Sequence, residues 1–335
     1  MSADVSGSCQ GRVRRGADSG RMNSSAITVS GLRRAYGDKT VLDGIDLDVP
    51  AGTVFSLLGP NGAGKTTTVN VLTTLMKADG GTVRIAGHDD ATETKAVRAV
   101  IGVTGQFAAV DDLLTGEENL QLMADLHHLR ADEGKRVVAA LLERFDLVES
   151  AQKMAATYSG GMRRKLDLAM TLVTRPEIIF LDEPTAGLDP RSRRTMWNIV
   201  RELVADGVTV FLTTQHLEEA DQLADQIAVL DQGHLVAEST PDELKRQVAG
   251  SHVRLRFTDV RELDAAARVL TGSTRDDEDL TLRVPSDGRA KSLRALLDQL
   301  DEHSIDVAEF SVHTPDLDDV FLTLTSHAST IGIAQ

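Results

Sequence analysis

The chain has 335 residues, of which 41% are hydrophobic and 26% are charged, a composition typical of a folded protein of about two domains. Its 51 acidic and 36 basic residues give a net charge of −15, which disfavours a nucleic-acid-binding role because such proteins carry a basic surface. The single cysteine, Cys9, excludes a disulfide framework within one chain. The longest apolar stretch, residues 137–142, is much shorter than the ~18 residues that a membrane-spanning helix needs.

Residues 1–25 are rich in Ser, Gly and Arg and contain no apolar run. We therefore expect a flexible tail, not a signal peptide. The next segment, residues 26–240, alternates short apolar runs with amphipathic stretches. That alternation predicts an α/β domain with a mostly parallel sheet.

The first strand expected in this domain, residues 44–49, alternates apolar with acidic side chains, so it should be an antiparallel edge strand with one solvated face. Five further runs are almost wholly apolar, as buried parallel strands are. They cover residues 53–58, 101–104, 178–181, 208–212 and 227–230. Amphipathic patterns predict helices at 65–76, 190–205 and 216–224.

The sequence G-P-N-G-A-G-K-T, residues 59–66, lies between an expected strand and an expected helix and fits the phosphate-loop pattern. Its glycines let backbone N–H groups point at phosphate oxygens, and the helix N-terminus adds its dipole. Lys65 can place a positive charge on the β- and γ-phosphates, and the Thr66 hydroxyl can bind Mg²⁺. The alternative is an ordinary glycine-rich turn.

Residues 113–175 contain no expected strand and three helical patterns, at 116–129, 133–146 and 159–173, which predicts a helical insertion into the sheet domain. The third pattern opens on Y-S-G-G-M, with Ser159 as the expected N-cap. A Ser-Gly-Gly helix start can bind an anion. Taken alone, it favours an ordinary capped helix.

The apolar run I-I-F-L at 178–181 ends in two carboxylates, Asp182 and Glu183. In a parallel sheet, side chains at the carboxyl ends of strands lie at the edge that binds ligands. Asp182 can then hold Mg²⁺, and Glu183 can polarise the attacking water. Without the phosphate loop, this pair of carboxylates would indicate an ordinary solvent-exposed turn.

The C-terminal part begins with an expected linker helix over 241–250, with Thr240 as its N-cap. A small accessory domain follows over 251–326, and residues 327–335 are expected to be a second tail. Strands are predicted at 252–257, 273–275, 279–284 and 305–312, and helices at 260–271 and 288–302. The order β-α-β-β-α-β predicts a ferredoxin-like α+β fold.

The motif order over residues 27–240 resembles that of the ATP-binding subunit of an ATP-binding-cassette (ABC) transporter. Tyr158–Met162 resembles the L-S-G-G-Q signature of that family, with Tyr for Leu and Met for Gln. The resemblance implies ATP and Mg²⁺ as ligands. It implies catalytic roles for Glu183, His216 and Gln106, and a metal site formed by Thr66, Gln106 and Asp182. The nucleotide-binding residues that it implies are Tyr36, Gly59, Pro60, Asn61, Gly62, Ala63, Gly64, Lys65, Thr66, Thr67, Ser159, Gly160, Gly161 and Asp189. Met162 removes a polar side chain from the signature, which puts the contact of the usual Gln in doubt.

Three longer segments resemble the daunorubicin-resistance type of drug-efflux ATP-binding subunit. They are Y-S-G-G-M-R-R-K-L-D-L-A, Q-H-L-E-E-A-D and, at 317–325, L-D-D-V-F-L-T-L-T. This resemblance implies a homodimer with two composite ATP sites. It also implies a separate integral-membrane permease, a location at the cytoplasmic face of the cell membrane, and export of a hydrophobic drug or antibiotic.

Three alternatives remain open at this point. A soluble mechanical ABC ATPase would act on nucleic acid or ribosomes, although the charge of −15 argues against a direct nucleic-acid contact. An importer ATPase would carry the same nucleotide motifs. A small-molecule phosphotransferase would share the phosphate loop but not the signature or His216.

Overall fold

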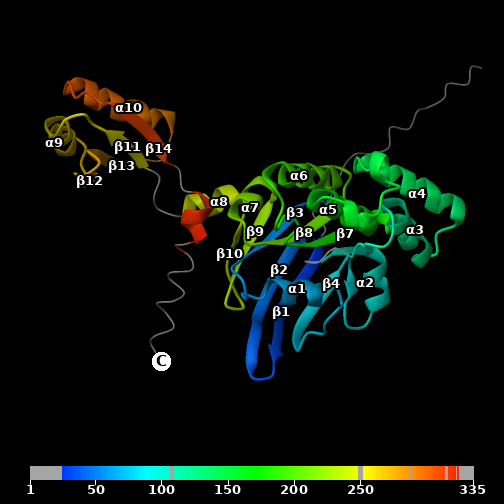
Figure 1. The fold of residues 1–335 in the computed structure, drawn as a ribbon. Helices are drawn as coiled ribbons and strands as arrows, with labels where there is room; N and C mark the ends of the chain where they lie inside the picture. The colour runs from blue at the N-terminus through cyan, green and yellow to red at the C-terminus, as the bar shows by residue number, and fades with distance from the viewer. Residues whose placement is uncertain are drawn as a thin grey trace, which may run out of the picture.

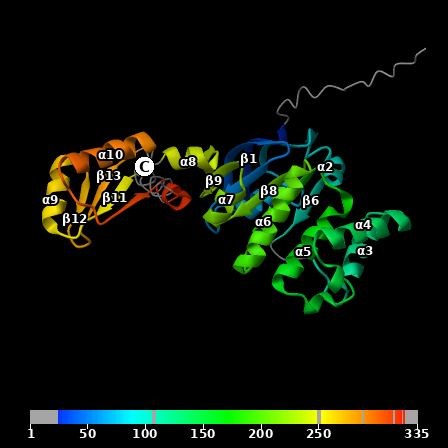
Figure 2. The same cartoon turned by 90° about the horizontal axis from the view of Figure 1, so that it is seen from above.

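The computed structural model describes residues 25–105, 109–247, 252–286, 289–313, 316–321 and 323. Its first unit is built around a six-stranded sheet in the order β10-β9-β3-β8-β7-β6. Most of these strands are labelled in Figure 1, and β6 is labelled in Figure 2. The strands are β3 (Val54–Leu58), β6 (Ile101–Thr104), β7 (Ile178–Asp182), β8 (Thr209–Thr214), β9 (Gln226–Asp231) and β10 (His234–Ser239). All neighbours are parallel except β9 and β10. The five predicted parallel strands are confirmed, and β10 is an addition.

A second, antiparallel sheet has the order β2-β1-β4-β5. It consists of β1 (Ser25–Tyr36), β2 (Lys39–Pro50), β4 (Gly80–Ile85) and β5 (His88–Asp89). The strand predicted at 44–49 is the second half of β2. One core cluster joins the two sheets and includes Leu42 and Ile85 from the second sheet and Phe55 and Phe211 from the first. The rings of Phe55 and Phe211 stack with their centroids 5.5 Å apart.

The predicted helical insertion is confirmed. It contains α3 (Gly116–Leu126), α4 (Ala131–Arg144) and α5 (Gly160–Thr171), with short 3₁₀ turns at Val148–Ser150, Ala155–Thr157 and Leu172–Thr174. Thr115 and Glu118 form a capping box that fixes the start of α3. Apolar side chains of these helices share one core cluster with Trp197 of the following helix.

The remaining helices of this unit are α1 (Lys65–Leu72), α2 (Thr94–Val100), α6 (Pro190–Ala205), α7 (Leu217–Leu223) and α8 (Pro241–Gln247). Helix α6 has the predicted bounds, whereas α1 ends four residues before the predicted end at 76. No helix in the described part of the chain combines the length and the apolar composition that a bilayer crossing requires.

The accessory unit contains β11 (His252–Arg256), α9 (Val260–Val269), β12 (Thr274–Asp276), β13 (Thr281–Pro285), α10 (Ala290–Glu302) and β14 (Glu309–His313). All its strand pairs are antiparallel, in the order β12-β13-β11-β14. This is the predicted ferredoxin-like arrangement. The last strand begins at Glu309 and not at 305. Its predicted first residue, Ile305, is instead buried in the core and hydrogen-bonds through its backbone N–H to Leu300 O, at the end of α10.

Residues 316–321 and 323 follow the accessory sheet, but they pack on the first unit. Leu317 and Val320 are buried, and they share a core cluster with Leu58, Val229 and Leu244 of that unit. The spacing of three residues places both side chains on one face of a helical turn. The domain limits at 240, 250 and 326 stay predictions, and this packing favours grouping residues 316–323 with the first unit.

Candidate functional site

The glycine-rich loop connects β3 to α1 at the carboxyl end of the central sheet. Its last glycine, Gly64, has φ +115°, and a Cβ there would lie 2.7 Å from Leu42 Cδ2. A side chain at this position would therefore push the loop away from β2. No side chain caps the start of α1, so its first N–H groups are available to an anion. Thr66 is exposed and Thr67 partly buried on the first turn of this helix.

The Lys65 side chain is buried and folds back onto its own loop. Its Nζ donates hydrogen bonds to Gly59 O at 2.8 Å and to Pro60 O at 3.1 Å. It also lies 3.6 Å from Glu183 Oε1. Burial lowers the pKa of Lys65, and the charges of Glu183 and Asp182 oppose that shift. The loop thus holds a cation beside the carboxylates of β7.

Asp182, the last residue of β7, joins three elements of the site. The Thr66 hydroxyl donates to Asp182 Oδ2 at 3.1 Å, and the Thr213 hydroxyl of β8 donates to Oδ1. A hydroxyl and a carboxylate from neighbouring elements are the hard oxygen ligands that Mg²⁺ prefers, so the donor set fits this ion. Glu183 has φ +49° and its backbone N–H donates to Thr213 O at 3.1 Å. Thr213 was not predicted as a site residue.

The end of β8 reaches the phosphate loop directly, because the Gly59 N–H donates to Thr214 O at 3.3 Å. His216 follows two residues later as the N-cap of α7, and its backbone N–H donates to the Thr214 hydroxyl at 2.9 Å. One turn along α7, Glu219 is fully buried and accepts a hydrogen bond from Trp197 Nε1 at 3.3 Å. Burial raises the pKa of this carboxyl.

Gln106, predicted to contact metal and water, lies outside the described residues. The residues on either side of the gap are held by helix α5. Arg164 Nη1 donates to Gly105 O at 2.9 Å, and the Ala109 N–H donates to Asp167 Oδ1 at 2.9 Å. Arg164 and Asp167 are both buried and pair at 3.1 Å.

The same guanidinium also fixes the backbone around the carboxylates. Arg164 Nη2 donates to Asp182 O at 3.2 Å, and Nε donates to Pro184 O at 3.0 Å. One side chain of α5 therefore connects Gly105 to the backbone of Asp182 and Pro184. We did not predict this pair from the sequence. The available signal was an Arg and an Asp three residues apart on a predicted helix, a spacing that lets the two side chains meet.

The signature residues open helix α5. Ser159 is its N-cap and accepts from the Met162 N–H at 3.3 Å. Met162, which stands in place of the usual Gln, packs against the core of the insertion. Asp189 caps the neighbouring helix α6 through the Ser192 N–H at 3.0 Å and the Ser192 hydroxyl at 2.6 Å. These hydrogen bonds lower the pKa of Asp189. Among the described residues, no hydrogen bond or ion pair joins residues 159–161 to the phosphate loop.

Tyr36, expected to stack on adenine, is the last residue of β1 and is 46% exposed. Its hydroxyl donates to Met76 Sδ at 3.1 Å, and Arg34 Cζ lies 5.2 Å from the ring centroid. The exposed ring offers an area for aromatic stacking.

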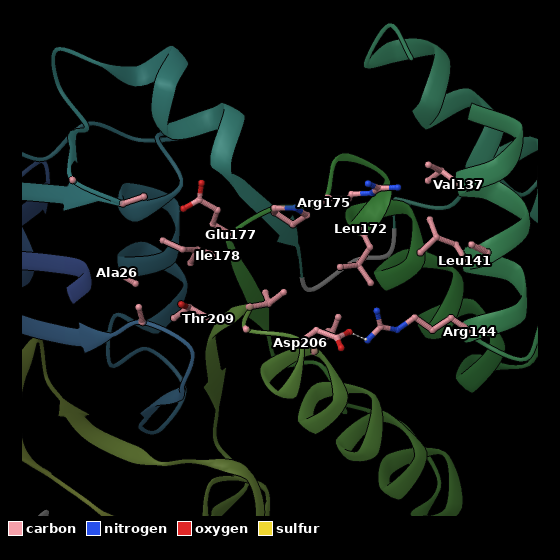
Figure 3. Close-up of a pocket in the computed structure, with 18 of the residues that line it drawn as sticks. Ala26, Val137, Leu141, Arg144, Leu172, Arg175, Glu177, Ile178, Asp206 and Thr209 are labelled. Carbon is pink, nitrogen blue, oxygen red and sulfur yellow. Dashed lines mark hydrogen bonds and ion pairs between the residues drawn. The ribbon is translucent and has the colours of Figure 1, made fainter. Parts of the chain in front are cut away.

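A cavity of about 910 Å³ lies elsewhere on this unit (Figure 3). Its lining includes Ile178 and Thr209, the first residues of β7 and β8, whereas the carboxylates and Thr213 lie at the other end of these strands. Arg144 and Asp206 both line the cavity and form an ion pair of 2.7 Å. The cavity is therefore at the edge of the sheet opposite the phosphate loop and is not part of that site.

Comparisons with known proteins cover almost the whole chain. A family model described as "ABC transporter" matches residues 42–186, and one described as "ATP-binding protein DrrA1-3-like, C-terminal domain" matches residues 240–325. A model of an osmosensitive K⁺ channel His kinase sensor domain matches residues 123–253 and overlaps the other two.

Curated relatives match over similar lengths. The daunorubicin resistance ATP-binding protein DrrA3 of Streptomyces coeruleorubidus is 49% identical over 91% of this chain and 97% of its own length. The doxorubicin resistance ATP-binding protein DrrA of Mycobacterium tuberculosis is 42% identical over 91% and 95%. A solved ATP-binding subunit of an ABC transporter is 29% identical, with a TM-score of 0.60 over 67% of this chain and 93% of that one.

Proposed function

The chain belongs to the ABC transporter family of ATP-binding proteins, and from that premise we propose that it drives export of a hydrophobic drug or antibiotic through a separate permease. As a member of this family it binds nucleotide and hydrolyses ATP. Relatives named for daunorubicin and doxorubicin resistance, and others named for Nod factor export, favour export over import. They also argue against a mechanical ATPase and a phosphotransferase.

The observation that carries the catalytic proposal is the contact network of Lys65, Thr66, Asp182 and Glu183 at one edge of the sheet. We propose that Lys65 exchanges its loop carbonyl partners for the β- and γ-phosphates of ATP. Glu183, 3.6 Å from Lys65, accepts a proton from the attacking water. Mg²⁺, bound through Thr66, Asp182 and Gln106, would neutralise charge on the phosphates. His216 contacts the γ-phosphate from the end of β8.

The signature lies outside this network, which supports a site shared between two copies. We propose a homodimer in which Ser159, Gly160 and Gly161 of one copy face the phosphate loop of the other. Residues 59–67 and Tyr36 bind the nucleotide on their own copy, and Asp189 contributes at the interface. Closing this dimer is the motion that drives transport.

The permease is expected to dock beside Gln106 and the helical insertion 113–175, which places the protein at the cytoplasmic face of the membrane. Arg164 and Asp167 support this location, because they connect Gly105 and Ala109, which flank residues 106–108, to the backbone of Asp182 and Pro184. We infer no direct nucleic-acid contact, given the net charge of −15.

Glu183→Gln tests the catalytic and dimer proposals together. The amide preserves side-chain size but cannot take up a proton, so hydrolysis should fall by about 10²–10⁴-fold. ATP and Mg²⁺ should still bind, and the variant should elute as a dimer in size-exclusion chromatography with Mg-ATP but not with Mg-ADP.

The matched control is Glu177→Gln, an exposed carboxylate just before the other end of β7. It should retain hydrolysis and should not accumulate the ATP-bound dimer. A Glu183→Gln protein that stays monomeric with ATP and hydrolyses at the normal rate would refute both the base and the shared site.

A further inference from the structure

Strand β14 leaves one side of the accessory sheet open. It lies beside β11 at the edge of that sheet (Figure 1) and pairs with no other described strand. All five of its residues are exposed. Two of them are large and apolar: Phe310 is 50% exposed and Val312 is 38% exposed. An edge strand with apolar side chains and unpaired backbone groups is a template for pairing with another strand.

The register with β11 separates the two faces of β14. Phe310 lies opposite Leu255 and Val312 opposite Val253, and both β11 residues are buried in the core under the helices. Directly opposed residues of a sheet point to the same face. The apolar pair therefore extends the core to the open edge, whereas Glu309, Ser311 and His313 occupy the other face.

The order of residues along β14 is complementary to itself. We propose that β14 pairs antiparallel with β14 of a second copy, about a two-fold axis at Ser311, so that the two accessory sheets become one. In this register Phe310 faces Val312 of the second copy, and Glu309 faces His313. An aromatic residue opposite a β-branched one is favourable across antiparallel strands, and the Glu309 carboxylate can accept a hydrogen bond from an imidazole N–H. The partner that the edge fits is thus another copy of this chain.

The polar residues at the two ends of β14 also have partners within their own copy. His313 Nε2 lies 3.3 Å from Asp319 Oδ2, and Glu309 Oε2 lies 3.8 Å from Arg256 Nη1 on the surface of the sheet. A register shifted by one residue would place Phe310 against His313 and Val312 against Ser311. That shift would lose both matches, so the two-fold register is the favoured one.

The inference rests on the proposed homodimer and adds a contact that needs no nucleotide. A five-residue strand pair buries much less than the ~1,200 Å² of a stable interface, so the edge alone gives weak association. Its contribution is to hold two ATP-binding units together between rounds of hydrolysis, which makes their closure effectively intramolecular.

Disulfide formation tests the proposed register. In a background with Cys9→Ser, Ser311→Cys places two cysteines opposite each other, where Cα atoms of antiparallel strands are about 4.5–5.5 Å apart and a disulfide fits. Glu309→Cys places its two cysteines four residues out of register, about 13 Å apart. Thr274→Cys is the matched control on β12, the other edge strand, where the side chain is also exposed.

Under mild oxidation without nucleotide, the Ser311→Cys protein should form a covalent dimer on the order of tenfold or more faster than the other two variants. Adding Phe310→Lys to it should abolish that advantage, because a lysine blocks edge pairing. Circular dichroism checks that each variant is folded. Equal rates for the cysteines at 311 and 274, or a faster reaction at 309, would overturn the proposal.

The cross-linking test of the edge contact and the test of the proposed function can fail independently. Cross-linking at 311 reports on the accessory edge without ATP, whereas the ATP-dependent dimer of Glu183→Gln reports on the shared nucleotide site. If the cysteines at 311 fail while that dimer forms, only the edge contact is refuted. If they react while that dimer does not form, the shared-site proposal fails and the edge contact stands.

Discussion

Lys65 Nζ lies 3.6 Å from Glu183 Oε1, and its hydrogen bonds go to carbonyl groups of its own loop. Lys65→Ala should abolish ATP hydrolysis and weaken nucleotide binding, because the positive charge at the β- and γ-phosphates is lost. Phosphate release and titration with a fluorescent ATP analogue measure the two effects. Lys77→Ala, an exposed lysine beyond α1, is the control and should leave both unchanged. Normal turnover in Lys65→Ala would contradict the phosphate-loop assignment.

Of the two adjacent arginines of α5, Arg164 should contribute more to the stability of the fold than Arg163. Arg164→Met leaves Asp167 buried without its cation, a change that typically costs about 3–5 kcal/mol. It also removes the hydrogen bonds to Gly105 O and Asp182 O. The backbone beside the catalytic carboxylates then loses support, so kcat for ATP hydrolysis should fall together with Tm. The adjacent Arg163→Met removes a surface pair with Asp112, worth about 0–1 kcal/mol, and a long hydrogen bond of 3.4 Å to Ala155 O. Arg164→Lys should recover little of the lost stability, because a single ammonium group cannot donate to several acceptors at once as the planar guanidinium does. Similar losses in the two Met variants would show that the buried network is unimportant.

Glu219 gives stability a defined pH dependence. Burial raises the pKa of this carboxyl above its ordinary value of 4.5, and the Thr185 and Thr214 hydroxyls, Trp197 and His216 oppose that shift. The folded state therefore holds the proton more tightly than the unfolded state. The free energy of unfolding is unaffected below the ordinary pKa, and it decreases as the pH rises from there through the raised pKa.

Glu219→Gln removes the buried charge while its amide oxygen can still accept from Trp197. Its gain in Tm should be near zero at acidic pH and should increase as the pH rises through the raised pKa of Glu219. Thermal unfolding followed across that range measures the effect. Glu218→Gln, whose carboxylate is exposed beside Arg193, is the matched control. A gain that is greatest at low pH would show that the direction of the shift is wrong.

At the scale of elements, helices α5 and α6 are in contact through Gly161. A Cβ at Gly161 would lie 2.6 Å from Ser192 Oγ, the group that donates to Asp189. Gly161→Ala should therefore disturb the cap of α6 and lower Tm. At Gly160 the nearest atom to a Cβ is Leu188 Cδ2, at 3.9 Å, so Gly160→Ala should leave Tm nearly unchanged. Differential scanning calorimetry of the two variants distinguishes this contact from a general intolerance of alanine at the signature.

The parallel strands could be predicted because their side chains are buried on both faces, which produces continuous apolar runs. Strand β1 could not, since register shifts between Val29 and Leu32 and between Arg34 and Ala35 interrupt its alternation. Strand β4 buries only Val83 and Ile85, which is too few to form a pattern. In each case, irregular pairing or shallow burial removed the periodic signal.

The candidate site, like the strands, could be predicted only in part. The phosphate loop, Asp182 and Glu183 are defined by short local patterns, and the contacts of Lys65 and Thr66 agree with those patterns. Arg164 instead donates to backbone carbonyls 18 to 59 residues away along the chain. Every residue type has a carbonyl group, so such contacts leave no trace in the sequence of the accepting segments.

At the scale of the whole molecule, the accessory sheet is connected to the ATP-binding unit at both of its ends. It follows α8, and it is followed by the segment carrying Leu317 and Val320. This segment packs against Leu58, the residue directly before the phosphate loop, and against Ala220 of α7. A displacement of the accessory sheet would therefore act on elements that hold the nucleotide site.

Deletion of residues 251–335 should leave ATP binding intact, because every nucleotide motif precedes residue 240. It should nevertheless lower Tm, since it exposes Leu58 and Val229 to solvent.

The double variant Leu317→Ser with Val320→Ser should produce a similar decrease, because it removes the same apolar contacts from the full-length chain. Truncation of a buried leucine typically costs about 2–5 kcal/mol. Leu297→Ser on α10, 39% exposed, is the control for apolar loss elsewhere. A deletion variant as stable as the full chain would show that this packing contributes nothing, and loss of ATP binding below its Tm would place the domain boundary elsewhere.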